Sequence, residues 1–384
     1  MRILILSSEF PPGPGGIGTH AYQLAKYFSV EAHPSLVLSP QAYVTDVERE
    51  AFNARQTFNI ITFPAKGNSL EKAIFRAKAL TKALQDFCPD IILVSGGRSI
   101  WLSAFVMRGQ GTPWVVAGHG TEFGATSGLS THLTRLACKQ ADAVVAVSEH
   151  TRLTMASQGI TKPRTKVIHN GADARFFQIL PQSEINAFRR KVDSKDQFVL
   201  LTVGNVTPRK GQEWIIRALP EIVKRHPQVV YWMAGLPSEQ QKLELLAANL
   251  GVSANIHFWG RVDQPTLLNL YNACDLFVMT SQQLKNGDFE GFGIAVLEAA
   301  LCGKTSVVTD NSGLAEAVQD GSTGLLVPQG QVEPIAWAVI DLIESPEKRN
   351  GLSTTAHTRA LRQQTWDHVG AAYLEFFEEV LREA

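Results

Sequence analysis

The sequence predicts an α/β protein with two doubly wound parallel-sheet domains, and three observations lead to this prediction. Short apolar runs, such as residues 3–6, alternate with longer segments of helical period, which is typical of buried parallel strands joined by helices. The alternation stops near residue 172 and restarts at residue 198, after a charged segment. At 384 residues, the chain is also too long for one ordinary hydrophobic core.

Bulk composition narrows the class of protein. Hydrophobic content of 45% and charged content of 19% are typical of a well-packed globule, and a formal net charge of zero gives no sign of nucleic-acid binding. Residues 1–172 carry 17 Lys and Arg against 11 Asp and Glu; since the chain has 36 of each, the remainder is acidic. The sequence shows no signal-peptide core and no membrane span, and its scattered cysteines are expected to be buried free thiols. We therefore expect a cytoplasmic protein. The four cysteines are Cys88, Cys138, Cys274 and Cys302.

The first half begins with a strand, a glycine-rich loop and a helix. The loop, residues 9–19, contains Gly15 and Gly16, and such loops hold phosphates on backbone N–H groups at a helix N-terminus. They also serve simple close packing. A dinucleotide oxidoreductase would need an acidic residue at the end of the second strand, where this chain has Ser39. Further strands are predicted at residues 60–63, 90–94, 114–117 and 141–149, and residues 166–173 end this half.

Two other features of the first half have alternative interpretations. His119 stands between two glycines after the strand at residues 114–117, where doubly wound sheets place ligands, which favours a functional role over a structural one. An amphipathic helix over residues 70–87 carries four cations beside its apolar stripe. They indicate either a solvated flank or a face for a membrane surface or an anionic acceptor. They are Lys72, Arg76, Lys78 and Lys82.

The second half repeats the strand-loop-helix pattern. After the strand at residues 198–203, Arg209 and Lys210 precede a helix, where two fixed cations would neutralise a diphosphate or form a solvated turn. Four more strands are predicted at residues 229–235, 256–262, 276–279 and 306–310, and a fifth at 324–327. Residues 356–384 are predicted to be helical, with an apolar face that packs on the first domain.

Residues 281–298 form a polar loop, a glycine turn and a helix. Glu290 lies just before this helix and Glu298 two turns into it, while Gly291 and Gly293 expose backbone N–H groups at its N-terminus. A helix N-terminus favours negative charge. The segment alone fits either a capped helix or a site for a nucleotide-sugar, whose phosphate and hydroxyls would need these groups.

Together these motifs resemble the family 4 retaining glycosyltransferases of the GT-B fold, over essentially the whole chain. The resemblance rests on their order and spacing. The motifs are Glu-Phe-Pro-Pro at 9–12, Gly-Gly-Ile-Gly at 15–18, His-Gly-Thr-Glu at 119–122, Ile-His-Asn-Gly-Ala-Asp at 168–173, the loop at 204–211, Gly-Arg-Val at 260–262, and Glu-Gly-Phe-Gly at 290–293 leading to Glu298.

The resemblance implies two Rossmann-like domains facing a central cleft. The acceptor-side domain would span residues 1–172 and the donor domain 173–362, and a helix at 363–384 would pack back on the first domain. Gly16, Arg209 and Lys210 would bind the donor diphosphate, with Phe292 and Gly293. His119 and Glu290 would contact the donor sugar, again with the backbone of Phe292 and Gly293, and Gly260, Arg261, Val262 and Glu298 would hold the base and ribose. Many members carry Arg where this chain has Asn205.

The function that the resemblance implies is transfer of a sugar from a nucleotide diphosphate, a UDP- or GDP-sugar, to an acceptor hydroxyl with α configuration. His119, Glu290, Arg209 and Lys210 are the predicted catalytic residues. No acidic pair of the DxD type is present, so no metal and no cofactor are expected. The basic first domain predicts a peripheral contact of the protein with the inner face of an anionic membrane. Two alternatives remain: a nucleotide-sugar epimerase of the same architecture, and a non-catalytic nucleotide-sugar-binding protein.

Overall fold

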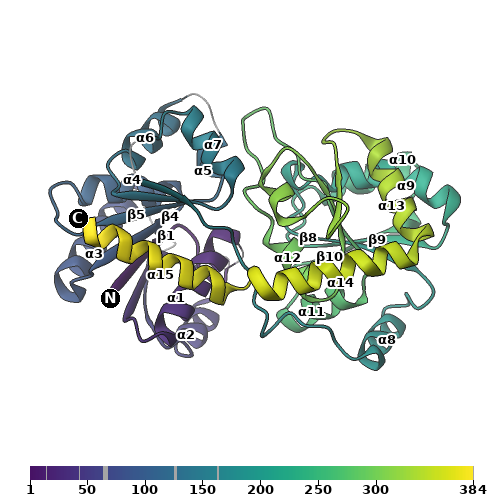
Figure 1. Ribbon diagram of the computed structural model, residues 1–384, viewed down its shortest axis with the longest axis horizontal. Helices are drawn as coiled ribbons and strands as arrows, with labels where there is room; N and C mark the ends of the chain where they lie inside the picture. Colours follow the sequence, from purple (N-terminus) through teal and green to yellow (C-terminus); the bar gives the residue numbers. More distant parts are fainter. Residues whose placement is uncertain (14, 43, 64–67, 125–127, 162–163, 384) are drawn as a thin grey trace. The chain divides into compact units, whose positions relative to one another are not determined.

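The structure is a computed structural model of residues 1–384, and it describes all of them except 14, 43, 64–67, 125–127, 162–163 and 384 (Figure 1). The chain forms two compact units. One comprises Met1–Asn170 together with Trp366–Ala384, and the other Gly171–Thr365. The predicted boundaries, after residues 172 and 362, lie close to these divisions.

The N-terminal unit contains a seven-stranded parallel sheet in the order β3-β2-β1-β4-β5-β6-β7. The order reverses between β1 and β4, so the loops after these strands diverge at the carboxyl edge of the sheet, where such folds bind ligands. The strands are β1 (Ile3–Ser7), β2 (Ser35–Pro40), β3 (Asn59–Phe63), β4 (Ile91–Ser95), β5 (Trp114–Gly118), β6 (Ala143–Ala146) and β7 (Arg164–Val167).

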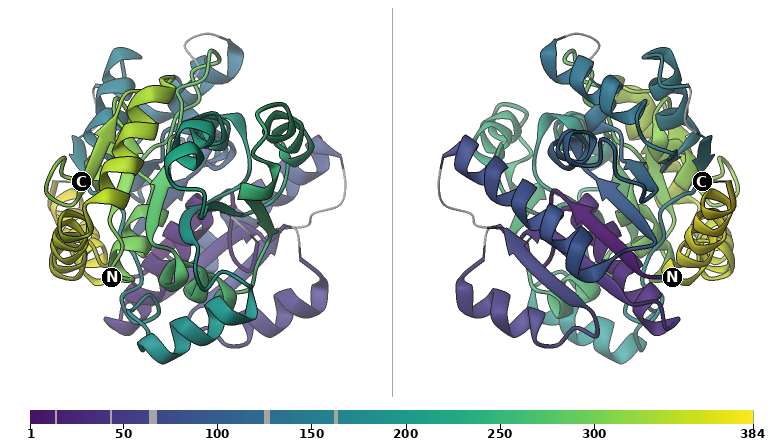
Figure 2. Two further views of the ribbon diagram at one scale, coloured as in Figure 1. Left: turned by 90° about the vertical axis from the view of Figure 1, so that its right-hand side faces the viewer. Right: turned by 90° about the vertical axis from the view of Figure 1, so that its left-hand side faces the viewer.

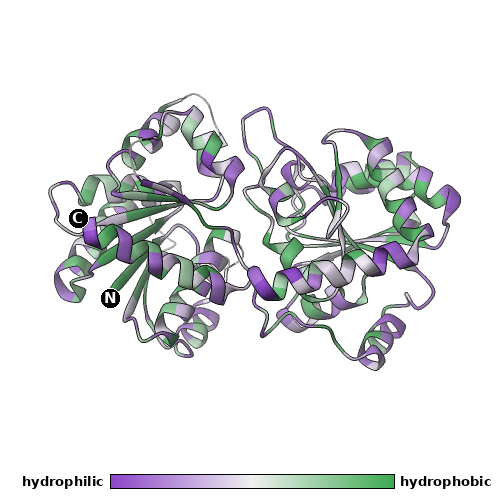
Figure 3. Ribbon diagram, viewed as in Figure 1, coloured by the Kyte–Doolittle hydropathy of each residue, from purple (hydrophilic) through white to green (hydrophobic). Residues whose placement is uncertain are grey.

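Helices cover both faces of this sheet. Every residue of β1, β4, β5 and β6 is buried, which explains their continuous apolar sequences. Figure 3 shows these apolar strands between helices of mixed polarity. The helices are α1 (Gly16–Val30), α2 (Asp46–Asn53), α3 (Ser69–Phe87), α4 (Gly97–Val106), α5 (Thr121–Gly124), α6 (Leu129–Cys138), α7 (Glu149–Ser157) and α15 (Trp366–Glu383).

Helix α15 belongs to the N-terminal unit although it ends the chain. Its apolar face is buried, and Phe377 packs on Phe28 of α1 with 5.8 Å between ring centroids. Gly370 allows the two helices to approach closely, because a Cβ atom there would lie 2.2 Å from the Tyr27 ring. Lys166 of β7 adds an ion pair with Glu379 at 3.1 Å.

The second unit contains a six-stranded parallel sheet in the order β10-β9-β8-β11-β12-β13, which reverses between β8 and β11. Its strands are β8 (Phe198–Val203), β9 (Val229–Ala234), β10 (Ile256–Gly260), β11 (Leu276–Met279), β12 (Ser306–Thr309) and β13 (Gly324–Val327). Its helices are α8 (Gln182–Lys191), α9 (Gln212–Arg225), α10 (Gln240–Asn249), α11 (Gln264–Ala273), α12 (Ile294–Leu301), α13 (Val332–Glu344) and α14 (Pro346–Gln363), with short 3₁₀ turns at η1 (Pro208–Lys210), η2 (Ser253–Asn255) and η3 (Gly313–Ala317).

Two expectations need correction. The C-terminal segment is not one helix, because α14 and α15 are separated at Gln364 and Thr365. The Gln364 carbonyl accepts a hydrogen bond from the Ala172 amide instead of continuing a helix. Cys88 is exposed rather than buried, since it follows the last turn of α3 in a left-handed conformation; the other three cysteines are buried as expected.

Candidate active site

Four charged side chains meet at the carboxyl edge of the second sheet. Arg209 and Lys210 belong to η1, which follows β8, and Asp288 and Glu290 belong to the loop that follows β11. Glu290 accepts hydrogen bonds from Arg209 and from the Lys210 ammonium, the latter at 2.8 Å. Arg209 Nε also lies 3.3 Å from Asp288 Oδ2. Two predicted diphosphate ligands and the predicted sugar ligand are therefore neighbours in space.

Backbone contacts hold these two loops together. The Gln282 amide donates to the Arg209 carbonyl at 2.8 Å, and Thr280 Oγ1 donates to the Gly211 carbonyl at 2.7 Å. Gly211 has a φ of 74°, and a Cβ atom at this position would lie 1.7 Å from the Thr280 carbonyl oxygen. Only glycine fits there, so this residue fixes the approach of η1 to the loop after β11.

The electrostatics of the cluster favour a charged carboxylate. Burial alone would raise the pKa of Glu290, but Lys210 and Arg209 outweigh it and lower that pKa to about 2. Burial lowers the pKa of Lys210; Glu290 opposes this shift and Arg209 adds to it. Two half-buried cations thus contact the same carboxylate, and an incoming anion would be bound by groups that are already fixed in place.

Helix α12 begins directly beyond this cluster. Gly293 is its N-cap with a φ of 91°, and a Cβ atom there would lie 2.4 Å from Leu314 Cδ1. Phe292 is buried and anchors the turn. The first turn of α12 follows, and the amides at the start of a helix are where a phosphate or sugar contact is predicted.

Glu298, two turns further along α12, accepts a hydrogen bond from the Tyr271 hydroxyl at 2.6 Å. Burial raises the pKa of Glu298 to about 7, although Tyr271 and Lys210 both act to lower it, and Asp173 adds to the rise. Its second carboxylate oxygen, Oε1, is the one left for the predicted ribose contact. Tyr271 of α11 was not identified from the sequence because a tyrosine in a helical apolar stripe gives no separate signal.

The predicted base-binding residues follow β10. Gly260 ends that strand with a φ of 63°, and its carbonyl accepts from the Gly235 amide at 2.9 Å. Arg261 is exposed and Val262 is half-buried. Gly260 therefore lies at the end of the edge strand β10, opposite Ala234 at the end of β9, and Arg261 and Val262 follow it. Asn205, at the end of β8, accepts a hydrogen bond from the Leu236 amide at 3.3 Å.

In the N-terminal unit, Gly16 is the first residue of α1 and has open space around it, since a Cβ atom there would meet nothing within 4 Å. The carboxylate of Glu9 lies beside the preceding residue, because a Cβ atom on Gly15 would be 1.9 Å from Glu9 Oε2. The start of α1 is thus bare backbone with an acid next to it. This open space would suit the predicted approach of a diphosphate, while the acid would favour hydroxyl groups.

His119 lies at the end of β5, and burial lowers its pKa to about 4, so it is neutral at physiological pH. Its Nε2 atom is buried and has no hydrogen-bond partner among the described residues. Its backbone amide donates to Glu122 Oε2 at 3.2 Å. An unpaired buried ring nitrogen is costly, and this one is available to a ligand.

Two residues that sequence reasoning missed support His119. The ring of His20, on α1, packs against it edge-on with centroids 4.7 Å apart, and His20 Nε2 lies 3.0 Å from the Tyr373 hydroxyl of α15. Burial, and then His119, lower the pKa of His20 well below its usual range. His20 lies four residues after Gly16 on α1, but nothing in the sequence linked it to a tyrosine 353 positions away.

Among the residues that the structure describes, no group of three or more His, Cys, Asp or Glu side chains is arranged to hold a metal ion. Within the same residues, no helix combines the length and apolar character needed to cross a bilayer.

Comparison with known proteins identifies the family. Residues 14–176 match the model for "Glycosyltransferase Family 4", and residues 184–359 match that for "Glycosyl transferases group 1". A GDP-mannose-dependent α-(1-6)-phosphatidylinositol monomannoside mannosyltransferase of Mycolicibacterium smegmatis is 27% identical over 97% of both chains. A glycogen synthase of Mycobacterium tuberculosis is 28% identical over 98% of this chain and 94% of its own. The structure of Anabaena HepE in complex with UDP and glucose superposes with a TM-score of 0.84, at 23% identity, over 99% of this chain and all of HepE. The chain therefore belongs to the family 4 glycosyltransferases and has the GT-B fold.

Proposed function

We propose that this glycosyltransferase transfers a sugar from a nucleotide diphosphate to an acceptor hydroxyl, with retention of α configuration and without a metal ion. The observation that carries the proposal is the cluster of Arg209, Lys210 and Glu290 beside the N-terminus of α12. It combines fixed positive charge for a diphosphate with a carboxylate for sugar hydroxyls.

In the proposed reaction, the bond between the anomeric carbon and the β-phosphate oxygen breaks, and its electron pair leaves with the diphosphate. Arg209, Lys210 and the α12 amides stabilise that charge, which is the largest catalytic contribution expected here. The acceptor oxygen bonds to the anomeric carbon from the same face, and its proton passes to the departing phosphate oxygen. Glu290 then hydrogen-bonds the sugar hydroxyls rather than acting as a nucleophile.

His119 has a different role under this proposal. Because its pKa is about 4, the ring is neutral and contributes a hydrogen bond to the sugar, not a positive charge. We retain His119 and Gly16 as donor contacts on the strength of the sequence resemblance, and Gly260, Arg261, Val262 and Glu298 as contacts of the base and ribose.

GDP-mannose is the first donor to test, because the mannosyltransferase from Mycolicibacterium smegmatis is named for it. UDP-glucose is the second, because the HepE structure contains UDP and glucose. We also propose a cytoplasmic protein in peripheral contact with anionic membrane, through the four cations of α3.

The test measures sugar transfer from each donor to lipid and soluble acceptors in EDTA, and reads the anomeric configuration of the product by proton NMR. An α-linked product formed equally well with and without EDTA supports the proposal. A β-linked product or a strict metal requirement contradicts it. Conversion of the donor without any acceptor would indicate an epimerase, and nucleotide binding without turnover would indicate a sensor.

A further inference from the structure

The N-terminal unit carries a groove between α3 and α4 that the proposed donor site does not use. A cavity of about 550 Å³ is lined by cations from both helices and by apolar side chains between them. In the right-hand view of Figure 2, α3 faces the viewer. The lining residues that the argument uses are Lys72, Arg76, Arg98, Trp101, Leu102 and Phe105.

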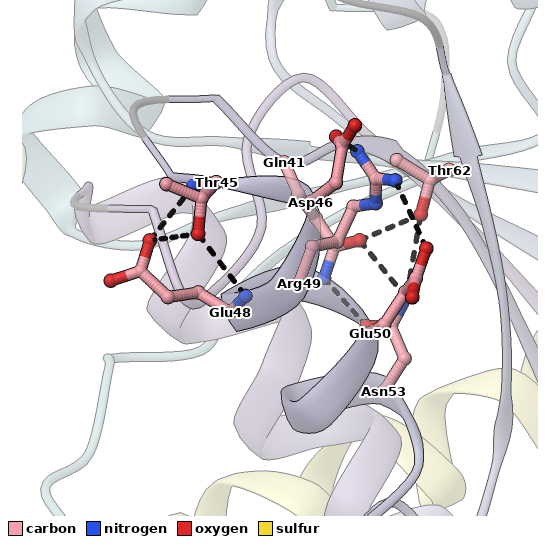
Figure 4. A network of polar contacts seen from close by, with 8 residues as sticks. All are labelled: Gln41, Thr45, Asp46, Glu48, Arg49, Glu50, Asn53 and Thr62. Atoms are coloured by element: carbon pink, nitrogen blue, oxygen red, sulfur yellow. Dashed lines mark hydrogen bonds and ion pairs between the residues drawn. The ribbon is translucent and has the colours of Figure 1, made fainter.

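The cations in this groove are not neutralised. Arg76 and Arg98 form no ion pair within the described part of the chain, and Arg76 Nε is buried without a hydrogen-bond partner. Arg76 rests on the Phe63 ring at 5.4 Å, which fixes its guanidinium. Burial, and then the charge of Arg98, lower the pKa of Arg76. Elsewhere in the same unit Arg49 is paired with Asp46 at 2.6 Å (Figure 4). A bound anion would relieve the repulsion between Arg76 and Arg98.

The apolar part of the groove is also exposed. Phe105 is 79% exposed and Ile74 47%, and both side chains line the groove. The indole N–H of Trp101 donates to Thr134 Oγ1 at 2.8 Å, so its ring remains as an apolar wall. A second cavity, of about 610 Å³, adjoins the first at Ala77 and Phe105. Exposed apolar surface of this kind, next to unpaired cations, marks a binding site rather than a solvated helix face.

The groove starts near His119, which is predicted to contact the donor sugar. Arg98 is the second residue of α4, which begins directly after β4, and Lys72 lies in the first turn of α3. A Cβ atom on Gly97 would lie 3.8 Å from Glu122, whose carboxylate binds the His119 amide. The charged end of the groove is therefore at the carboxyl edge of the sheet, on the same side as His119, and the second cavity lies farther along α3.

We propose that this groove binds the acceptor, and that the acceptor is an anionic amphiphile with a lipid phosphate on Arg76 and Arg98 and its first methylene groups against Trp101 and Phe105. That the bound molecule is the sugar acceptor rests on the proposed function, whereas the binding of an anionic amphiphile does not depend on it. A phosphate next to a hydrocarbon chain is the chemistry that two unpaired guanidiniums beside exposed apolar side chains would recognise.

The test measures binding of dihexanoylphosphatidic acid, below its critical micelle concentration, to the full-length protein by calorimetry. We expect it to bind more tightly than dihexanoylphosphatidylcholine and inorganic phosphate. The double change Arg76→Gln and Arg98→Gln should weaken binding by roughly 10- to 100-fold, because two charged hydrogen bonds are lost. Arg49→Gln is the matched control and should bind normally. Phe105→Ser should weaken binding several-fold, whereas Val47→Ser, which removes another exposed apolar side chain, should not.

Equal binding of both short-chain lipids, or full binding by the double variant, would overturn the proposal. Phosphate binding as tight as the lipid would indicate a free-phosphate site, and binding to anionic vesicles alone would indicate a general membrane surface; either result overturns it as well. GDP and UDP binding, measured on the same variants, should be unchanged. If the wild-type protein transferred sugar to neither lipid nor soluble acceptors, the proposed function would be refuted, whereas the lipid-binding result would stand.

Discussion

The predicted sugar-binding ends of the two units differ in charge. In the second unit, the buried carboxylate of Glu290 pairs with the half-buried cations Arg209 and Lys210. In the first unit, buried His20 packs against half-buried His119, and both rings are neutral because burial lowers both pKa values. Under the proposed function, the charged cluster would bind the diphosphate, and the two neutral histidine rings would lie beside the sugar. If that function is right, the cations of the second unit stabilise the leaving group and the histidines of the first unit orient the sugar.

The largest effect should come from the charged side of this comparison. Lys210→Ala removes a cation that stabilises the leaving diphosphate, and kcat should fall on the order of 10²–10³-fold, by analogy with other preorganised donors to developing negative charge. Steady-state kinetics with the best donor measures this. The control is Arg217→Ala, which removes a cation of α9 that pairs with Glu213. Turnover within a few-fold of the wild type would show that Lys210 does not have this role.

On the neutral side, His119→Ala should lower kcat/KM by roughly one to two orders of magnitude, as expected for a lost hydrogen bond in a buried site. The activity of the wild type should show no ionisation of His119 between pH 5.5 and 8, because its pKa is about 4. A pH profile of kcat/KM, compared between wild type and His119→Ala, checks this. If the variant removed an ionisation near pH 6.5, His119 would be exposed to water and the neutral assignment would be wrong.

Glu298 provides a pH-dependent test of stability. Its pKa is about 7 in the folded protein and near 4.3 when unfolded, so the folded state binds more protons between these values. The free energy of unfolding should therefore fall as pH rises from about 4.5 to 7, by on the order of 1–3 kcal/mol, and then level off. Glu298→Gln should remove this slope. Urea titrations at several pH values measure it, and an identical slope in the variant would assign it to other groups.

Much of this architecture follows from sequence periodicity. Buried parallel strands have continuous apolar sequences, and the glycines at 211 and 293 mark loops where the backbone approaches other groups, so the strands and the loop positions could be predicted. Partners distant in sequence could not. Tyr271 and Tyr373 are apolar-stripe residues by pattern, and only the fold shows that their hydroxyls contact Glu298 and His20. Leu70 belongs to the apolar stripe of α3 by periodicity and yet is 70% exposed, because periodicity gives the apolar face of a helix but not whether another element covers that face.

The smallest expected effect concerns Tyr373, which contacts His20 in the pair of neutral histidines, His20 and His119. The Tyr373 hydroxyl lies 3.0 Å from His20 Nε2 and thereby fixes the His20 ring that packs against His119. Tyr373→Phe keeps the packing but removes this hydrogen bond, so unfolding should become easier by about 1 kcal/mol. Since His119 would then be held less firmly, kcat should fall by a few-fold with an unchanged affinity for the nucleotide.

Phe376→Leu, on the same helix, is the matched control: it disturbs the packing of α15 but leaves the His20 hydrogen bond in place, so it should reduce stability without this loss in kcat. Chemical denaturation and steady-state kinetics on both variants separate the two effects. If both variants lost turnover in proportion to stability, Tyr373 would serve only to dock α15. The neutral pair would then be positioned by β5 and α1 without help from the end of the chain.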